Sequence, residues 1–189
     1  MKVGLYFGSF NPIHTGHCII ASHLVQNTGL DQVWLVVTPQ NPFKTSSALL
    51  NEYHRLALVR LALEGESKLK AIDIEFHLPR PSFTIDTLAY LSEKYPTHVF
   101  SIIMGSDSLQ NLHNWKNAGT LVKNYTIYVY RRPGYEASTS LPAKLVVLDA
   151  PLLEISSTNI RKMIKEGKSI RYLVPENVRE EIEKGGYYK

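Results

Sequence analysis

The amino-acid sequence predicts an α/β protein with a doubly wound parallel sheet, helices on both faces of that sheet, and a small C-terminal helical region. Three observations support this fold class. The chain has 189 residues, of which 44% are hydrophobic, which is enough to bury one full core. Short apolar runs alternate with longer amphipathic runs, as in parallel sheets covered by helices. Glycine or proline follows several apolar runs, where a strand has to end. We expect a single domain over residues 1–189.

The strands are predicted from apolar runs bounded by turn residues. Their expected ranges are 3–7, 32–37, 70–76, 98–104, 125–130 and 145–148. Gly8 and Gly105 follow the first and fourth of these runs directly, and Pro39 follows the second. The run at 70–76 is weaker than the others. Because ligands of such sheets bind outside the carboxyl ends of the strands, the loops after these runs are the first candidates for a functional site.

The helices are predicted from apolar residues at helical spacing. Their expected ranges are 15–28, 51–63, 84–94, 115–122, 158–165 and 175–183. Gly29 supplies a stop for the first helix. Leu56, Val59 and Leu63 share one face of the second helix. The last two helices make up the C-terminal helical region, from about residue 156 to 189.

The net charge of +4 is concentrated in one stretch of the chain. Residues 161–171 contain one acid, Glu166, and a cluster of bases: Arg161, Lys162, Lys165, Lys168 and Arg171. The remainder of the chain is neutral, so the pattern indicates a local anion site rather than a surface that coats nucleic acid. A solvated helix face is the alternative interpretation.

No apolar run approaches the roughly 20 residues that a membrane span needs, and no secretory signal pattern precedes the first strand. The single cysteine, Cys18, cannot form an internal disulfide. These features predict a cytoplasmic protein that binds neither membrane nor nucleic acid.

The first loop reads Gly-Ser-Phe-Asn-Pro-Ile-His-Thr-Gly-His from Gly8 to His17. Thr15 is expected to cap the following helix, whose first amides would face an anion. His14 and His17 are three residues apart and can reach one spot, where imidazoles donate hydrogen bonds to phosphate and a positive charge stabilises a leaving phosphate. Two alternatives stay open: a metal site that includes Cys18, and a packed histidine beside a helix cap.

A second polar segment, Ile-Ser-Ser-Thr-Asn-Ile-Arg, runs from Ile155 to Arg161. Its hydroxyl residues can cap the helix that follows. Arg161 falls in the first turn of that helix, where a cation opposes the helix dipole by about 0.3–1 kcal/mol. An anion bound at the same helix end would reverse this penalty, so the order of the residues favours a phosphate site.

These residues carry a resemblance. The first loop resembles the His-x-Gly-His motif of the nucleotidylyltransferase superfamily, and the second segment is similar to the Ile-Ser-Ser-Thr-x-Ile-Arg signature of adenylyltransferases. Three middle segments, at 81–88, 104–115 and 131–134, resemble those of the bacterial nicotinate-nucleotide adenylyltransferases. The resemblance extends from Val3 to about Arg171. It implies a Rossmann-like fold and a reaction in which the AMP moiety of ATP joins nicotinate mononucleotide. The products are nicotinate adenine dinucleotide (deamido-NAD) and pyrophosphate, within NAD biosynthesis, with Mg²⁺ carried by ATP.

The resemblance also implies roles for individual residues. The groups that act on the transferring phosphate are His14, His17, Lys44 and Arg161. The ATP-binding residues are Gly8, Ser9, Phe10, His14, Gly16, His17, Gly105, Asp107, Ile155, Ser156, Ser157, Thr158 and Arg161. The residues that bind nicotinate mononucleotide are Ser9, Lys44, Thr84, Asp107, Trp115 and Arg132, with Trp115 stacked on the pyridine ring. No residue is predicted to be a metal ligand.

Lys44 lies in the segment 38–50, which is expected to form a mobile lid. The chain departs from the family there, because Asn41 stands in place of a proline and Phe43 in place of a histidine.

Other functions remain open on sequence grounds. Another transferase of the same superfamily, such as phosphopantetheine adenylyltransferase or a cytidylyltransferase, would share both end motifs but not the segment with Trp115. A nucleotide-binding regulator would keep the pocket without turnover, and a nucleic-acid-binding module would use the basic cluster. Nicotinate is favoured over nicotinamide mononucleotide by the resemblance alone. The tail residues Tyr187 and Tyr188 leave a homo-oligomer open.

Overall fold

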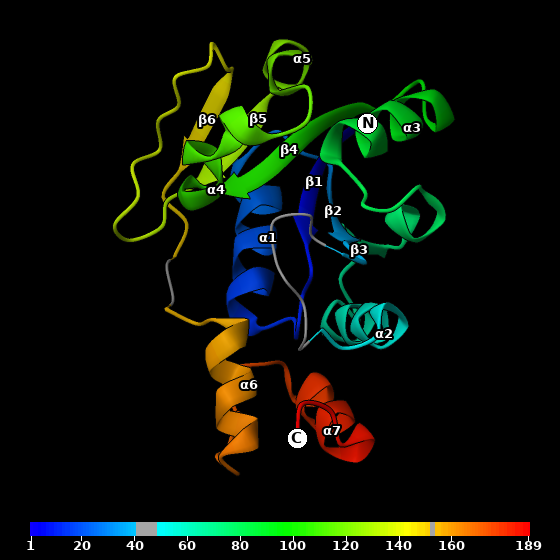
Figure 1. Ribbon diagram of the computed structural model, residues 1–189, viewed down its shortest axis with the longest axis vertical. Helices are drawn as coiled ribbons and strands as arrows, with labels where there is room; N and C mark the ends of the chain where they lie inside the picture. Colours follow the sequence, from blue (N-terminus) through cyan, green and yellow to red (C-terminus); the bar gives the residue numbers. More distant parts are fainter. Residues whose placement is uncertain (41–48, 152–153) are drawn as a thin grey trace.

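The computed structural model describes residues 1–40, 49–151 and 154–189. Its centre is a six-stranded sheet in the order β3-β2-β1-β4-β5-β6, and every neighbouring pair is parallel (Figure 1). The strands span Lys2–Gly8 (β1), Gln32–Val37 (β2), Leu69–Ile72 (β3), Val99–Gly105 (β4), Ile127–Tyr130 (β5) and Leu145–Leu148 (β6). The strand order reverses between β1 and β4, which is where ligands of doubly wound sheets bind.

Helices cover both faces of this sheet, as the sequence predicts. The principal helices span Thr15–Asn27 (α1), Glu52–Ala62 (α2), Thr84–Lys94 (α3), Ser106–Gln110 (α4), Ala118–Asn124 (α5), Ser157–Lys165 (α6) and Glu176–Gly185 (α7). One buried cluster joins α1, α2, α6 and α7 to the sheet, and a second joins α3 and α5 to it. In β1, Leu5 belongs to one cluster and Tyr6 to the other, because alternate side chains point to opposite faces. The α/β doubly wound class is therefore confirmed.

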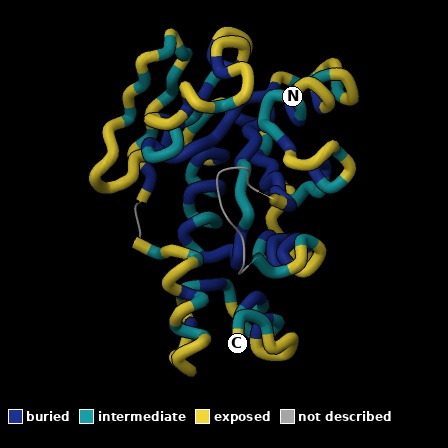
Figure 2. Tube along the Cα trace, viewed as in Figure 1, coloured by how far each residue is buried: buried dark blue, intermediate teal, exposed yellow. Residues whose placement is uncertain are grey.

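The C-terminal helices α6 and α7 lie together at one end of the molecule (Figure 1). Their apolar residues Ile160, Val178 and Ile182 are buried in the same cluster as α1. Both helices carry buried stretches beside exposed ones (Figure 2). The Thr15 amide donates to the Leu173 carbonyl at 2.9 Å, which joins the start of α1 to the segment between α6 and α7. This hydrogen bond attaches the C-terminal helical region to the start of α1.

Several boundaries differ from those expected. The strand predicted at 70–76 ends at Ile72, and a 3₁₀ turn, η1 (Ile74–His77), follows because it buries the Glu75 side chain instead of continuing the pairing. The helix predicted at 115–122 begins only at Ala118, since Asn117 adopts a left-handed conformation with φ 52°. The short helix α4, Ser106–Gln110, stands where a loop was expected. No helix among the described residues is both long and apolar enough to cross a membrane.

Candidate active site

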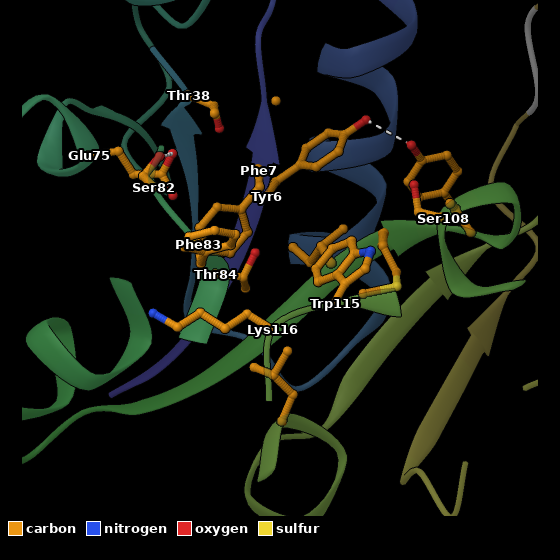
Figure 3. Close-up of a pocket in the computed structure, with 16 residues that line it drawn as sticks. Tyr6, Phe7, Thr38, Glu75, Ser82, Phe83, Thr84, Ser108, Trp115 and Lys116 are labelled. Atoms are coloured by element: carbon orange, nitrogen blue, oxygen red, sulfur yellow. Dashed lines mark hydrogen bonds between the residues drawn. The ribbon is translucent and has the colours of Figure 1, made fainter. Parts of the chain in front are cut away.

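Two adjoining cavities open at the carboxyl ends of β1 and β4. The larger has a volume of about 500 Å³ and the smaller about 150 Å³. Their walls share residues of β1, α4 and β5: Tyr6, Phe7, Gly8, Ser108 and Tyr130. Within these shared walls the Tyr6 hydroxyl donates to the Tyr130 hydroxyl at 3.3 Å (Figure 3). The two cavities therefore form one continuous cleft at the switch point of the sheet.

The first loop forms one wall of the larger cavity. Phe10 has a left-handed backbone with φ 43°, and its ring lies over Gly8 so closely that a Cβ at Gly8 would come within 2.9 Å of a ring carbon. Glycine is therefore required where the chain leaves β1. His14 caps α1 in place of the expected Thr15, and its carbonyl accepts the His17 amide at 2.9 Å.

Arg55, on α2, holds this loop from behind. It is fully buried, and among the described residues its guanidinium donates to backbone carbonyls alone, at Ser9, Thr38, Pro39 and Leu50. Burial lowers the pKa of Arg55 from its ordinary value, although an arginine stays charged. A buried guanidinium with four backbone acceptors ties together three segments that are far apart in the sequence.

The two histidines of this loop are stacked. Their ring centroids are 3.6 Å apart, and the His14 amide donates to Nδ1 of His17 at 3.3 Å. Because Nδ1 of His17 accepts, a neutral His17 carries its proton on Nε2. Burial, followed by the charge of Arg132, lowers the pKa of His14 to about 4. His14 is therefore neutral at pH 7 and can offer a hydrogen bond rather than the positive charge that the sequence suggested.

The start of α6 forms the opposite wall. Ser156 caps the helix by accepting from the Asn159 amide at 3.2 Å, as predicted. The Ser157 hydroxyl donates to the Pro12 carbonyl at 2.9 Å, and Arg161 Nη1 donates to the Asn11 carbonyl at 2.7 Å. The two segments singled out at the ends of the sequence are thus joined by direct hydrogen bonds.

Residues after β4 and β5 complete the larger cavity. Arg132 Nε lies 3.4 Å from Asp107 Oδ1, and the Arg132 amide donates to the Ser106 hydroxyl at 2.8 Å. A Cβ at Gly105 would collide with the Asp107 carboxylate and would come within 3.1 Å of Arg132 Nε. Gly105 therefore allows this ion pair to lie against the end of β4.

The smaller cavity is walled by aromatic and cationic side chains. Thr84, Phe83 and Trp115 line it together with Lys116 (Figure 3). Lys116 Nζ lies 4.8 Å from the centre of the Phe83 ring and 2.8 Å from an Asp86 oxygen. This places a flat ring and a nearby cation in one small space.

Glu75 lies in the wall of the same cavity and is 2% exposed. It accepts hydrogen bonds from the Ser82 and Thr87 hydroxyls, both at 2.9 Å, and burial raises the pKa of its carboxyl. These contacts position the segment that begins α3, including Phe83 and Thr84.

Most of the residues predicted to bind ATP line the larger cavity. Ser9, Asp107 and Arg132, which are predicted to bind nicotinate mononucleotide, line it too. Gly16 lines an adjacent cavity with His14 and Ile155, and Gly105 lines the smaller cavity, with Thr84 and Trp115. Lys44 lies outside the described residues, as do residues 41–48 of the predicted lid at 38–50.

Sequence reasoning did not identify Arg55, Glu75, Lys116 or Tyr130. A signal existed for Arg55, because it precedes Leu58 and Val59 by three and four residues and so falls on the apolar face of α2. Lys116 and Glu75 carry no such signal, since their importance depends on the segments packed against them.

No group of three potential metal ligands occurs among the described residues. Burial raises the pKa of the Cys18 thiol to about 11, so at neutral pH Cys18 is a protonated thiol.

Comparison with known proteins gives concordant matches. Residues 5–163 match the family model described as cytidylyltransferase-like. A relative from Flavobacterium johnsoniae, named "Probable nicotinate-nucleotide adenylyltransferase", is 52% identical over 193 residues, which cover 100% of both chains. A relative of the same name from Cytophaga hutchinsonii is 51% identical over 189 residues, covering 100% of this chain and 98% of the relative.

Among solved structures, the Plasmodium falciparum nicotinic acid mononucleotide adenylyltransferase complexed with NaAD is similar with a TM-score of 0.84. Its sequence is 22% identical, and the match covers 99% of this chain and 97% of that one. At this level of identity the likeness establishes the shared fold.

Proposed function

The chain belongs to the cytidylyltransferase-like family and, within it, to the nicotinate-nucleotide adenylyltransferases, and from this premise we propose how its cleft binds and positions the two substrates. The enzyme is a nucleotidyltransferase of NAD biosynthesis. It joins the AMP moiety of ATP to nicotinate mononucleotide and releases pyrophosphate. The observation that carries the assignment of the site is that both end segments line one cavity, which opens into the smaller cavity with Trp115.

ATP occupies the larger cavity in this proposal. Its phosphates lie between the histidine pair and the start of α6, where His17, Arg161 and the Ser156–Thr158 hydroxyls converge. A helix N-terminus favours negative charge. Arg161 already donates to the Asn11 carbonyl, and its guanidinium retains further N–H donors for phosphate.

Nicotinate mononucleotide spans the two cavities. The pyridine ring lies against Trp115 in the smaller cavity, and the phosphate points toward Ser9, Asp107 and Arg132 in the larger. Lys116 lies beside Phe83 and Thr84 and contributes a positive charge on the side of the pyridine carboxylate. This charge favours nicotinate over nicotinamide, which bears a neutral amide instead.

The transfer itself is a direct displacement. An oxygen of the nucleotide phosphate attacks the α-phosphorus of ATP, and the bond from that phosphorus to the bridging oxygen breaks as pyrophosphate leaves with the electron pair. The nucleophile is already an anion, so no general base is required. The protein's part is to align the two phosphates and to stabilise the spreading negative charge with His14, His17 and Arg161.

The donor set of the larger cavity suits a magnesium ion that enters with ATP. Among the described lining residues, Asp107 is the one carboxylate, and it is paired with Arg132. The phosphates would therefore supply most of the ligands, as is usual for Mg²⁺. When bound, the ion neutralises charge on the phosphates.

A matched assay tests this function. Purified enzyme with ATP is offered nicotinate mononucleotide, nicotinamide mononucleotide, phosphopantetheine and a cytidylyl-transfer substrate pair, and pyrophosphate release is measured. We expect turnover chiefly with nicotinate mononucleotide. Equal efficiency with either pyridine nucleotide would remove the role of Lys116, and ATP binding without turnover would favour a regulator instead. A radiolabelled adenylyl group trapped on the protein would contradict direct transfer.

We also propose that the chain forms one domain and acts in the cytoplasm. The buried cluster that runs without a break from α1 to Ile160, Val178 and Ile182 supports one domain. The free thiol of Cys18 suits a reducing compartment.

A further inference from the structure

A further hollow, distinct from the three cavities above, is lined in part by Arg161. It has a volume of about 670 Å³ and lies between α6, the segment at Leu49 and Leu50, and the tail at Tyr188 and Lys189. Four cations line it: Arg161, Lys162, Lys165 and Lys189. We call it the basic cleft. Three of its cations belong to the charged cluster at 161–171, and two of these, Lys162 and Lys165, have no role in the active site described above.

The basic cleft is continuous with the larger cavity. Thr158, Arg161 and Leu49 line both spaces. Thr158, Arg161, Lys162 and Lys165 recur at helical spacing, so they form one stripe along α6 that extends about 10 Å from its N-terminus at about 1.5 Å per residue. A cationic track therefore leads from the phosphate end of the active site away along the helix.

Little of this charge is neutralised by neighbouring acids. Glu166 lines the basic cleft, but its carboxylate lies 2.7 Å from Lys168 Nζ and 3.8 Å from Lys162 Nζ, so it pairs chiefly with a lysine outside the cleft. Lys165 forms no ion pair among the described residues, and the Lys162 side chain is 72% exposed. The Tyr188 hydroxyl, buried in the cleft wall, makes no hydrogen bond within the described part of the chain. The site thus offers more ammonium and guanidinium donors than Glu166 can pair with.

We propose that the basic cleft is a subsite for inorganic pyrophosphate, through which the product leaves the active site; this inference rests on the proposed function. Pyrophosphate is a compact polyanion that is released beside Arg161, and the stripe supplies successive cations along its way out. A nucleic acid would need basic residues over a broad surface, whereas the rest of this chain is neutral.

Two double variants with equal loss of charge test the inference. Lys162→Ala/Lys165→Ala removes two cations from the basic cleft. Arg171→Ala/Lys184→Ala removes two cations that do not line it and leaves Lys168 in place, because Lys168 pairs with Glu166 in the cleft wall. All four side chains are exposed, so both variants should fold, which circular dichroism checks. Calorimetric titration with sodium pyrophosphate measures the Kd, and pyrophosphate inhibition and the KM for ATP are measured in the forward reaction.

We expect the first variant to raise the Kd and the inhibition constant for pyrophosphate about tenfold, with a smaller rise in the KM for ATP, because each lysine loses a charge-assisted contact. The control should change either value by less than about twofold, because its side chains do not line the cleft and exposed charges that make no direct contact contribute little.

If both variants weakened pyrophosphate binding equally, the cluster would act through its overall positive potential rather than through a site. If neither weakened it, pyrophosphate would not bind in the cleft. An equal rise in the KM for ATP and in the Kd for pyrophosphate would assign the lysines to the triphosphate site instead. Each of these results overturns the inference. Calorimetry requires no turnover, so an inactive wild-type enzyme would refute the proposed function without being mistaken for failure of this subsite.

Discussion

The two segments that meet in the larger cavity, the first loop and the start of α6, are held in opposite ways. His14 is 6% exposed and Phe10 is 2% exposed, and Arg55 fixes the first loop through buried hydrogen bonds. At the start of α6, Ser156 and Thr158 are exposed, and the segment is joined to the loop through Ser157 and Arg161. One wall of the cavity is therefore part of the core, while the other is attached to it from outside.

This contrast indicates that the two walls of the cavity have different roles. The buried wall is organised before substrate binds, so its residues contribute both to stability and to catalysis. The exposed wall carries charge that solvent stabilises until a phosphate replaces the water. Substitutions in the first wall should therefore lower stability and activity together, and those in the second should lower activity with far less effect on stability.

The largest effect is expected from Arg55→Met. Four backbone carbonyls would lose their donor, which should cost at least about 4 kcal/mol of unfolding free energy, since each unsatisfied buried group costs roughly 1–3 kcal/mol. Urea unfolding measures the change. Arg60→Met on the same helix is the control, because the Arg60 side chain is 61% exposed, and should have little effect. Equal losses would mean that Arg55 does not organise the loop.

Next comes His17→Ala, which removes a donor to the transferring phosphate. We expect kcat to fall by a factor on the order of 10² or more with both substrates saturating. His23→Ala, farther along α1 and away from the cleft, is the control. Full activity of His17→Ala would break the assignment of the histidine pair.

Arg161→Ala tests the exposed wall. Its kcat should fall by a similar factor, on the order of 10², while the midpoint of thermal unfolding falls far less than in the Arg55 variant, because one backbone carbonyl, that of Asn11, loses its donor. Activity assays and thermal unfolding on the same preparations check both parts. A large loss of stability would erase the distinction between the two walls.

The pH dependence of stability sharpens the comparison further. The pKa of His14 is about 4 in the folded protein, below its ordinary value of 6.5, so the unfolded chain binds more protons between these values. Stability should therefore fall as the pH is lowered through this range, by about 1 kcal/mol from pH 7 to 5.5 for this group. His14→Asn should lose that part of the dependence, measured by urea unfolding at several pH values. An unchanged profile would contradict a buried, neutral His14.

The smallest effect is expected from Lys116→Met, which removes the exposed cation of the smaller cavity. The ratio of kcat/KM for nicotinate over nicotinamide mononucleotide should fall about fivefold, chiefly through nicotinate, as is typical of a partly exposed charge interaction. Lys94→Met is the control, because Lys94 lies at the C-terminal end of α3 and does not line the smaller cavity. Equal loss with both substrates would give Lys116 a structural role only.

Much of the fold could be predicted from sequence because strands and helices of this type have local signatures. All six strands occur near their expected positions. The failures lie at Ile74–His77 and before Ala118, where tertiary contacts override local pattern. Glu75 turns the chain inward to meet Ser82 and Thr87, and hydroxyl partners seven and twelve residues away leave no periodic trace.

The sequence by itself determined the α/β class, the two candidate phosphate-binding segments and the family resemblance, because periodicity, capping residues and short motifs are properties of neighbouring residues. Only the tertiary structure decided that His14 is neutral, that Arg55 supports the first loop, and that Lys116 lines the smaller cavity. The physical reason is that burial and charge pairing depend on residues distant along the chain. Arg161 illustrates the local and the tertiary contribution. Its position in the first turn of the helix predicts a site for an anion, but its contact with Asn11, 150 residues earlier, exists only in the folded protein.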